Sequence, residues 1–155
     1  MIHKKTQLTH TNTLITGIAM SKQAKTLTSA ELRRVLDYIA TRKHSVRNRA
    51  LLMTTHLSGM RVGEVASLRN SDVLDAEGNI RNEIRLSAEQ TKGKEARVVF
   101  INDRLRKELE QYTLIFDKSK VEINQKFFYS QKRTSDGFTA NTLTQFFHYL
   151  YKQAG

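Results

Sequence analysis

The sequence of 155 residues contains no cysteine and no proline. Without cysteine it has no disulfide framework, no thiolate zinc site and no cysteine nucleophile. Without proline it has no proline-rich linker and no polyproline ligand. It also lacks an apolar run approaching the about 20 residues that a membrane-spanning helix needs. A secretory signal fits the first 20 residues poorly, because polar residues separate their lysines from their apolar patch. We therefore expect a cytoplasmic protein that does not enter the membrane.

Sequence patterns for bound metals and nucleotides are missing as well. The five histidines do not pair at ligand spacing with another histidine or a suitable carboxylate. There is no H-E-x-x-H motif, no phosphate-binding Walker loop and no G-x-G-x-x-G motif. We therefore expect neither a metal site nor a cofactor.

Positive charge is abundant. Lysine and arginine number 26 against 15 acidic residues, so the formal net charge is +11. Such a chain is attracted to polyanions, to nucleic acid first and to anionic membranes second, although some basic proteins bind neither. Residues 1–25 hold four lysines and no acidic residue, and we interpret them as a mobile basic extension. Met20 is an alternative to Met1 as the true start.

Hydrophobic periodicity predicts one helix-rich α+β domain over residues 26–155. The run Thr28-Ser29-Ala30-Glu31 is a capping box, which predicts the start of a first helix. Gly59 is expected to end a second helix. Helices are predicted near 29–40, 46–57, 61–68, 102–115 and 139–155. Two strands near 84–86 and 96–101 are predicted to form a small antiparallel hairpin, with its turn at 91–94 and Gly93 at the bend.

The most informative segment surrounds Arg61. This arginine follows Gly59 and lies in the first turn of a predicted helix, where a guanidinium can bind two phosphate oxygens. Glu64 lies three residues later on the same face, where we expect it to hold the Arg61 side chain in position. From spacing alone, an ordinary surface Arg–Glu pair is the simpler interpretation.

Two motifs nevertheless resemble the tyrosine recombinases, the family of phage integrases and chromosome-dimer resolvases. The run Ser58-Gly59-Met60-Arg61, followed by Glu64, Leu68 and Asp72-Val73, is similar to the box that holds the first catalytic arginine. The segment 91–99 resembles the hairpin whose turn carries the catalytic lysine, although Phe100 stands where the family often has proline. The likeness covers about residues 26–155 and implies part of a recombinase catalytic domain.

The resemblance implies transesterification of double-stranded DNA without metal. In this family a tyrosine attacks a phosphodiester, arginines stabilise the transition state and a lysine protonates the leaving 5′ oxygen. By this analogy Arg61 contacts the reacting phosphate and Lys92 is the general acid, with Lys94 as the alternative. A plain phosphate contact is the other interpretation of Lys92. We further expect DNA contacts from Lys94, Arg97, Arg47 and Arg49, and structural support of the site from Glu64.

The resemblance also predicts what the chain lacks. The family continues with a His-x-x-Arg box and then the nucleophilic tyrosine, and neither matches here. Tyr149 and Tyr151 lie too early, and we interpret them as core edge or DNA-facing surface. We therefore expect a truncated, nucleoid-associated recombinase that binds DNA and does not cleave it alone. Alternatives are a non-enzymatic regulator that competes for recombination sites and an inactive remnant. Truncation should expose Phe146, Phe147 and Leu150 and favour self-association.

Overall fold

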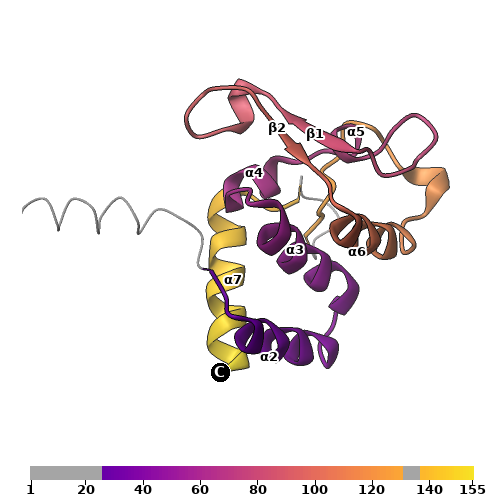
Figure 1. Ribbon diagram of the computed structural model, residues 1–155. Helices are drawn as coiled ribbons and strands as arrows, with labels where there is room; N and C mark the ends of the chain where they lie inside the picture. The colour runs from indigo at the N-terminus through magenta and orange to yellow at the C-terminus, as the bar shows by residue number, and fades with distance from the viewer. Residues whose placement is uncertain (1–25, 131–136) are drawn as a thin grey trace, which may run out of the picture.

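The computed structural model describes residues 26–130 and 137–155, which form a helical body with a small β-hairpin at one end (Figure 1). The predicted extension at 1–25 lies outside the described residues. In chain order the elements are α2 (Ser29–Ala40), α3 (Ser45–Ser58), α4 (Val62–Ser67), α5 (Asn70–Val73), β1 (Glu83–Leu86), η2 (Ala88–Gln90), β2 (Arg97–Phe100), α6 (Asp103–Thr113), η3 (Lys118–Lys120) and α7 (Ala140–Ala154). The predicted α+β class, mainly helical, is confirmed.

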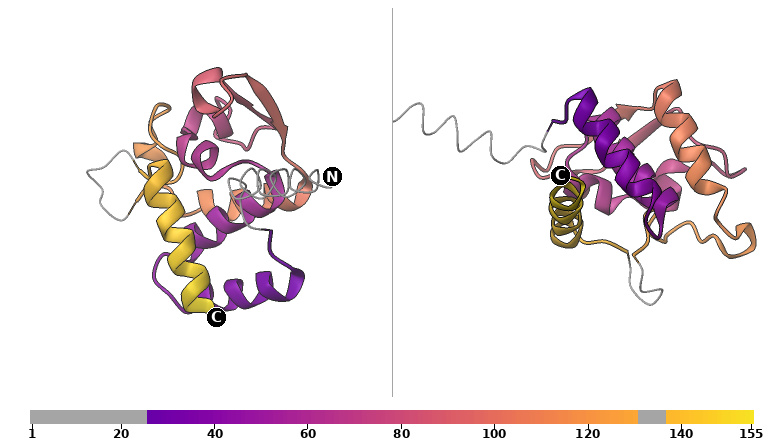
Figure 2. Two further views of the ribbon diagram at one scale, coloured as in Figure 1. Left: turned by 90° about the vertical axis from the view of Figure 1, so that its left-hand side faces the viewer. Right: turned by 90° about the horizontal axis from the view of Figure 1, so that it is seen from below.

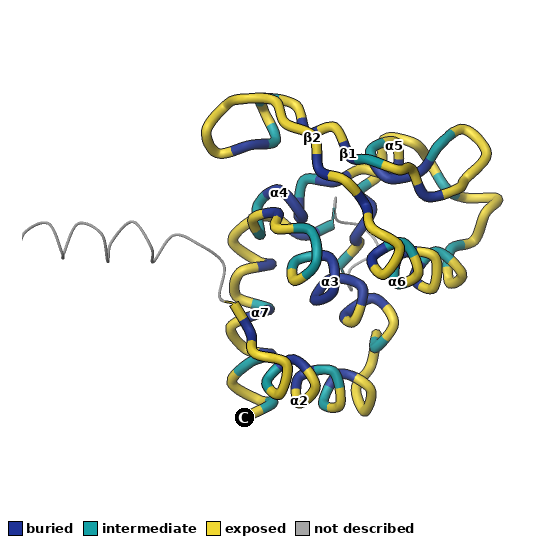
Figure 3. The backbone as a smooth tube through the Cα atoms, in the orientation of Figure 1, coloured by how far each residue is buried: buried dark blue, intermediate teal, exposed yellow. Residues whose placement is uncertain are grey.

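Helix α3 is the centre of the body. It packs against α6 on one side and against α2 and α4 on others, while α7 packs along α4 and α2 (Figure 1, Figure 2). Half of the α3 residues are buried, and its backbone is the darkest helix in Figure 3. Apolar residues of α2, α3, α4, α6 and α7 pack together in one core. This core gives the hairpin and the α3–α4 junction a rigid base.

The predicted helix starts are confirmed where a side chain caps the first turn. The Thr28 hydroxyl accepts the Glu31 amide and the Glu31 carboxylate accepts the Thr28 amide, so α2 begins with a complete capping box. Asn102 caps α6 through the amide of Leu105, at 2.8 Å. Helix α6 ends at Thr113, two residues before the predicted end at Ile115, which is 47% exposed and lies outside the core.

The sheet has two antiparallel strands. Their register pairs Glu83 with Phe100, Ile84 with Val99, Arg85 with Val98 and Leu86 with Arg97. Ile84, Leu86 and Val99 are buried, whereas Val98 and Phe100 are exposed on the opposite face. One face of the hairpin therefore packs on the body, and its turn projects beyond α4 (Figure 1).

The apolar run at 127–129 forms an irregular buried segment. Phe127 and Phe128 are almost fully buried, and both rings lie against Tyr112 of α6 with centroids 5.2 Å away. The Phe127 amide donates to the Leu68 carbonyl at 2.8 Å, and the Tyr112 hydroxyl donates to the Phe127 carbonyl at 2.9 Å. This segment thereby ties α6 to the end of α4.

The structure corrects the expected exposed face of the last helix. Phe147 and Leu150 are each only 4% exposed, and Phe146 is partly buried, because α2 and α4 cover this side of α7. Phe147 and Leu150 are therefore core residues and not the open apolar face that was expected. Within 26–130 and 137–155, no helix is long and apolar enough to cross a membrane.

The glycine at the end of α3 gives the first testable prediction. Gly59 has φ of +72°, in the left-handed region, although a Cβ there would meet no atom within 4 Å. The Gly59→Ala variant should therefore be destabilised by backbone strain alone, by about 1 kcal/mol, and Gly59→Asn by less. Urea unfolding measures both.

Gly93 is the matched control, because a Cβ there also meets nothing and its φ is not in the left-handed region. The Gly93→Ala variant should change the free energy of unfolding by less than about 0.5 kcal/mol. Equal losses for Gly59→Ala and Gly93→Ala would contradict the role given to the backbone of Gly59.

Candidate nucleic-acid interface

The junction between α3 and α4 presents Arg61 to solvent. Gly59 ends α3 in the left-handed conformation, which turns the chain away from the helix axis. Met60 is 1% exposed and its amide donates to the Ser58 hydroxyl at 3.0 Å, so it anchors the turn in the core. Arg61 then takes the N-cap position of α4 with an extended backbone and an exposed side chain.

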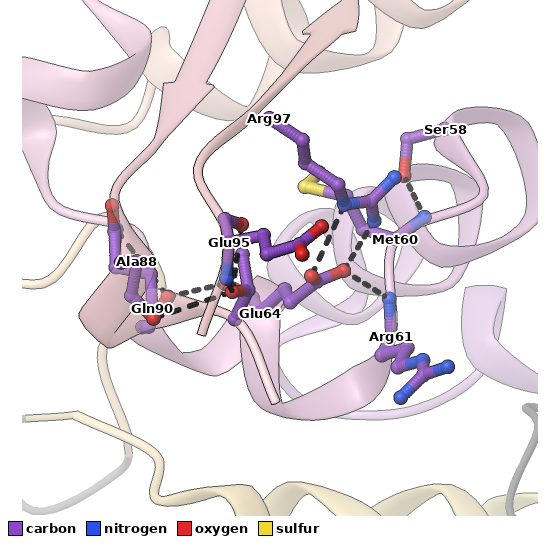
Figure 4. Close-up of polar contacts among 10 residues, drawn as sticks. Ser58, Met60, Arg61, Glu64, Ala88, Gln90, Glu95 and Arg97 are labelled. Carbon is purple, nitrogen blue, oxygen red and sulfur yellow. Dashed lines mark hydrogen bonds and ion pairs between the residues drawn. The ribbon is translucent and has the colours of Figure 1, made fainter. Parts of the chain in front are cut away.

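Glu64 is the buried acid of this junction. It is 4% exposed, and its Oε1 accepts the Arg61 backbone amide at 2.9 Å (Figure 4). The same carboxylate accepts two hydrogen bonds from the Arg97 guanidinium, one from Nη2 to Oε1 and one from Nε to Oε2 at 3.2 Å. A single carboxylate thus joins the start of α4 to strand β2.

Competing effects act on the pKa of this carboxyl group. Burial alone would raise the pKa of Glu64, but the hydrogen bonds from Arg97 and from the Arg61 amide outweigh it and lower the pKa below its ordinary value. The same contact raises the pKa of Arg97. Glu64 is therefore a stable anion at neutral pH.

The structure corrects the predicted link between Glu64 and the Arg61 side chain. Glu64 binds the Arg61 backbone, and its side-chain partner is Arg97 from 33 residues later. The Arg61 guanidinium points away from the Arg97–Glu64 pair (Figure 4) and has no hydrogen-bond or ion-pair partner among the described residues. It is consequently available to an external anion.

The turn of the hairpin is closed by Thr91. Its hydroxyl donates to the Glu95 carbonyl at 2.9 Å and accepts the Glu95 amide at 3.1 Å, and the residue is 8% exposed. Lys94 takes a left-handed conformation with φ of 57° within this turn. Lys92 and Lys94 are both exposed, so the closed turn holds two cations in solvent.

One groove collects most of the predicted site. Arg61, Glu64, Lys92 and Arg97 all line it, although they come from α4, the hairpin turn and β2. The complete lining is Thr26, Thr55, His56, Gly59, Met60, Arg61, Glu64, Thr91, Lys92, Gly93, Glu95 and Arg97. Lys94 does not line the groove, but it lies two residues from Lys92 in the same turn. Among the described residues, no group of three or more His, Cys, Asp or Glu side chains could hold a metal ion.

The structure corrects the expected DNA contact of Arg47. This residue is 2% exposed, and its guanidinium donates to Asn48 Oδ1 at 2.9 and 3.1 Å and to the Tyr129 carbonyl at 3.2 Å. The guanidinium carbon also lies 5.2 Å from the centre of the Phe138 ring. Burial lowers the pKa of Arg47. Arg47 therefore belongs to the core, where a phosphate cannot reach it.

Arg49 has a different position from its neighbour. It makes two hydrogen bonds of 2.8 Å to the Glu108 carboxylate, which join α3 to α6. Its side chain stays 49% exposed, but it does not line the groove. A DNA contact by Arg49 stays a prediction.

His56 and Thr91 are among the groove-lining residues that the sequence did not identify as part of the site. His56 lies in the last turn of α3, and its place three residues before the helix-ending glycine is the signal that would have found it. Thr91 stands directly before Lys92, and a threonine at the start of a Gly-containing turn is a recognisable turn-closing residue.

The comparisons with known proteins agree with this architecture. The model of the phage integrase family matches residues 25–155. A crystal structure of XerA recombinase is similar, with 25% sequence identity and a TM-score of 0.60. The match covers 86% of this chain and 43% of that chain, so this chain spans less than half the length of that structure. No curated protein matches the chain.

The Glu64–Arg97 pair gives the second prediction. Glu64→Ala should lower the free energy of unfolding by about 1–3 kcal/mol, because it leaves the Arg61 amide and the Arg97 guanidinium without their acceptor. Arg97→Ala should also destabilise, because it leaves a buried carboxylate unpaired. The double variant should lose less than the sum of the two single losses.

Denaturant unfolding of the four proteins measures this coupling. The exposed pair Glu83–Arg85, at 3.0 Å, is the control and should couple by about 0–0.5 kcal/mol. The pKa of Glu64 is lowered in the folded protein, so the stability that this carboxylate contributes is fully present above its ordinary pKa of 4.5. That stability is lost as the pH falls through the lowered pKa of the folded state. The Glu64→Gln variant should lose this part of the acid dependence. Additive losses with an unchanged acid profile would contradict the pairing.

Proposed function

The chain belongs to the phage integrase family of tyrosine recombinases, and on that premise we propose that it binds double-stranded DNA for site-specific recombination or integration. Arg61 and Lys92 contact the phosphate at which the strands are exchanged. The observation that carries this proposal is that both cations line one groove and have no hydrogen-bond or ion-pair partner among the described residues. This partner implies a cytoplasmic, nucleoid-associated location.

The groove suits a phosphodiester. Phosphoryl transfer depends mainly on positioning and on neutralising the charge that spreads over the phosphate oxygens. The Arg61 guanidinium can bind two of these oxygens at once, and a lysine supplies a point charge from another direction. The hydrogen-bonded side-chain partner of the buried Glu64 is Arg97, so the Arg61 guanidinium keeps its hydrogen-bond donors for the phosphate.

We propose a second role for Lys92 in the same reaction. When a phosphodiester bond to the 5′ oxygen breaks, that oxygen needs a proton, and the Lys92 ammonium is the donor that the family resemblance implies. Lys94 is the alternative donor, because it is exposed in the same turn. Arg97 lines the groove and its side chain stays 42% exposed, so we propose it as a further DNA contact.

The tyrosines of the chain lie outside the groove. None of the groove-lining residues is a tyrosine. Tyr112 is fully buried, Tyr149 is 61% exposed on α7, and the Tyr151 ring stacks on Phe147 at 5.9 Å. We therefore propose that these 155 residues bind DNA without cleaving it alone. The same observation favours a second candidate function, a non-enzymatic regulator that competes for recombination sites.

DNA affinity against salt concentration tests the groove. Each neutralised phosphate contributes about 0.9 to the slope of log K against log salt. Arg61→Ala and Lys92→Ala should each weaken binding to one duplex and lower the slope by about one. Arg61→Lys should restore the slope better than the affinity, because a lysine cannot bind two oxygens as a fork. Fluorescence anisotropy with a labelled duplex measures both quantities.

Matched controls come from two exposed cations that do not line the groove, Arg33 of α2 and Lys118 of η3. Arg33→Ala and Lys118→Ala should keep the wild-type slope within about 0.3. If Arg61→Ala leaves affinity and slope at the wild-type values, Arg61 is an ordinary surface residue and the proposal is wrong.

A nicked suicide substrate tests the absence of cleavage. Because no tyrosine lines the groove, the chain should form no covalent protein–DNA adduct, as judged by denaturing electrophoresis and mass spectrometry. A full-length recombinase of the family serves as the positive control. An adduct that maps to Tyr149 or Tyr151, and disappears in the corresponding phenylalanine variant, would show that the chain cleaves DNA.

A further inference from the structure

The groove contains an ionisable side chain that the proposed function does not use. His56 is exposed in the last turn of α3 and lines the same groove as Arg61 and Lys92. Its backbone position is set by a helix whose other face is buried in the core, so the imidazole is carried by a rigid element. No hydrogen bond or ion pair joins His56 to another described residue through its side chain.

Few charged groups share the groove with His56. Arg61 and Glu64 come from the start of α4, Lys92 and Glu95 from the hairpin turn, and Arg97 from β2. Glu64 and Arg97 satisfy each other. That leaves Arg61 and Lys92 against the exposed Glu95, so the groove with neutral His56 has a small positive excess. A protonated His56 would enlarge that excess next to the two proposed phosphate contacts.

From this placement we propose that His56, when protonated, is a third cationic contact with the DNA backbone in the groove. The ligand is a phosphodiester oxygen, which accepts an imidazolium N–H. The inference rests on the proposed function, since it needs the DNA backbone to enter the groove beside Arg61 and Lys92. It adds to that function a dependence of DNA affinity on pH.

The sign of this dependence follows from linkage. A phosphate beside an imidazole favours its protonated, charged form over its neutral form. Because a histidine ordinarily changes its charge between pH 5 and 8, DNA affinity should rise as the pH falls through that range and decline as it rises. One hydrogen bond from a charged donor corresponds to about tenfold tighter binding at the lower pH.

Salt titrations at about pH 5.5 and about pH 8, near the two ends of the range in which a histidine ordinarily changes its charge, test the proposal. Wild type should bind about tenfold tighter at the lower pH, with a slope steeper by about 0.9 because one more phosphate is neutralised. His56→Gln should lose most of both differences. His56→Lys carries its charge at both pH values and should show the steeper slope at both.

His148→Gln is the matched control, because His148 is exposed on α7 and does not line the groove. It should keep the wild-type pH dependence. If His56→Gln keeps it too, while Arg61→Ala weakens binding at both pH values, the role of His56 is refuted and the proposed function stands. If Arg61→Ala changes nothing at about pH 8, the proposed function itself fails.

Discussion

One buried carboxylate organises the surface on which this account depends. Glu64 is buried, and its carboxylate accepts hydrogen bonds from three donors, the Arg61 amide and two nitrogens of Arg97. These bonds offset the cost of burying the charge. The contact fixes strand β2 against the start of α4 (Figure 4). The hairpin turn consequently stands beside the α3–α4 junction, and a groove forms between them. Glu64 is thus a structural residue whose effect on Arg61 runs through the backbone.

Two local devices then orient the cations. Gly59 ends α3 with a left-handed backbone, and the buried Met60 anchors the turn that follows. Arg61 comes directly after this turn, with its side chain in solvent. Thr91 closes the hairpin turn through both backbone groups of Glu95 and so holds Lys92 across the groove. Neither cation has a hydrogen-bond or ion-pair partner among the described residues. No such bond therefore has to be broken before a phosphate binds. A site arranged in advance loses little free energy to reorganisation when its ligand arrives.

Features determined within a few residues could be predicted from the sequence. The Thr28–Glu31 capping box, the helix stop at Gly59 and the hairpin all depend on neighbours, and the structure contains each of them. Features determined by distant partners could not. Glu64 is bound by Arg97 because the hairpin folds over α4, which no i,i+3 rule anticipates. Arg47 is buried because its guanidinium donates to the Tyr129 carbonyl, 82 residues later, and packs on the Phe138 ring. Phe147 and Leu150 are covered because α7 returns to α2 and α4.

The central claim is that a DNA phosphate occupies the groove between the α3–α4 junction and the hairpin turn. The most direct measurement is an NMR titration of the ¹⁵N-labelled chain with a short duplex, following backbone amides and the Arg61 side-chain Nε–H. We predict that the amides of Gly59, Arg61 and 91–95 shift together and saturate with one dissociation constant, and that the Arg61 Nε–H signal shifts with them. The amides of η3 should not move. Shifts confined to other basic surfaces, with the Arg61 Nε–H signal unchanged at saturation, would contradict the account.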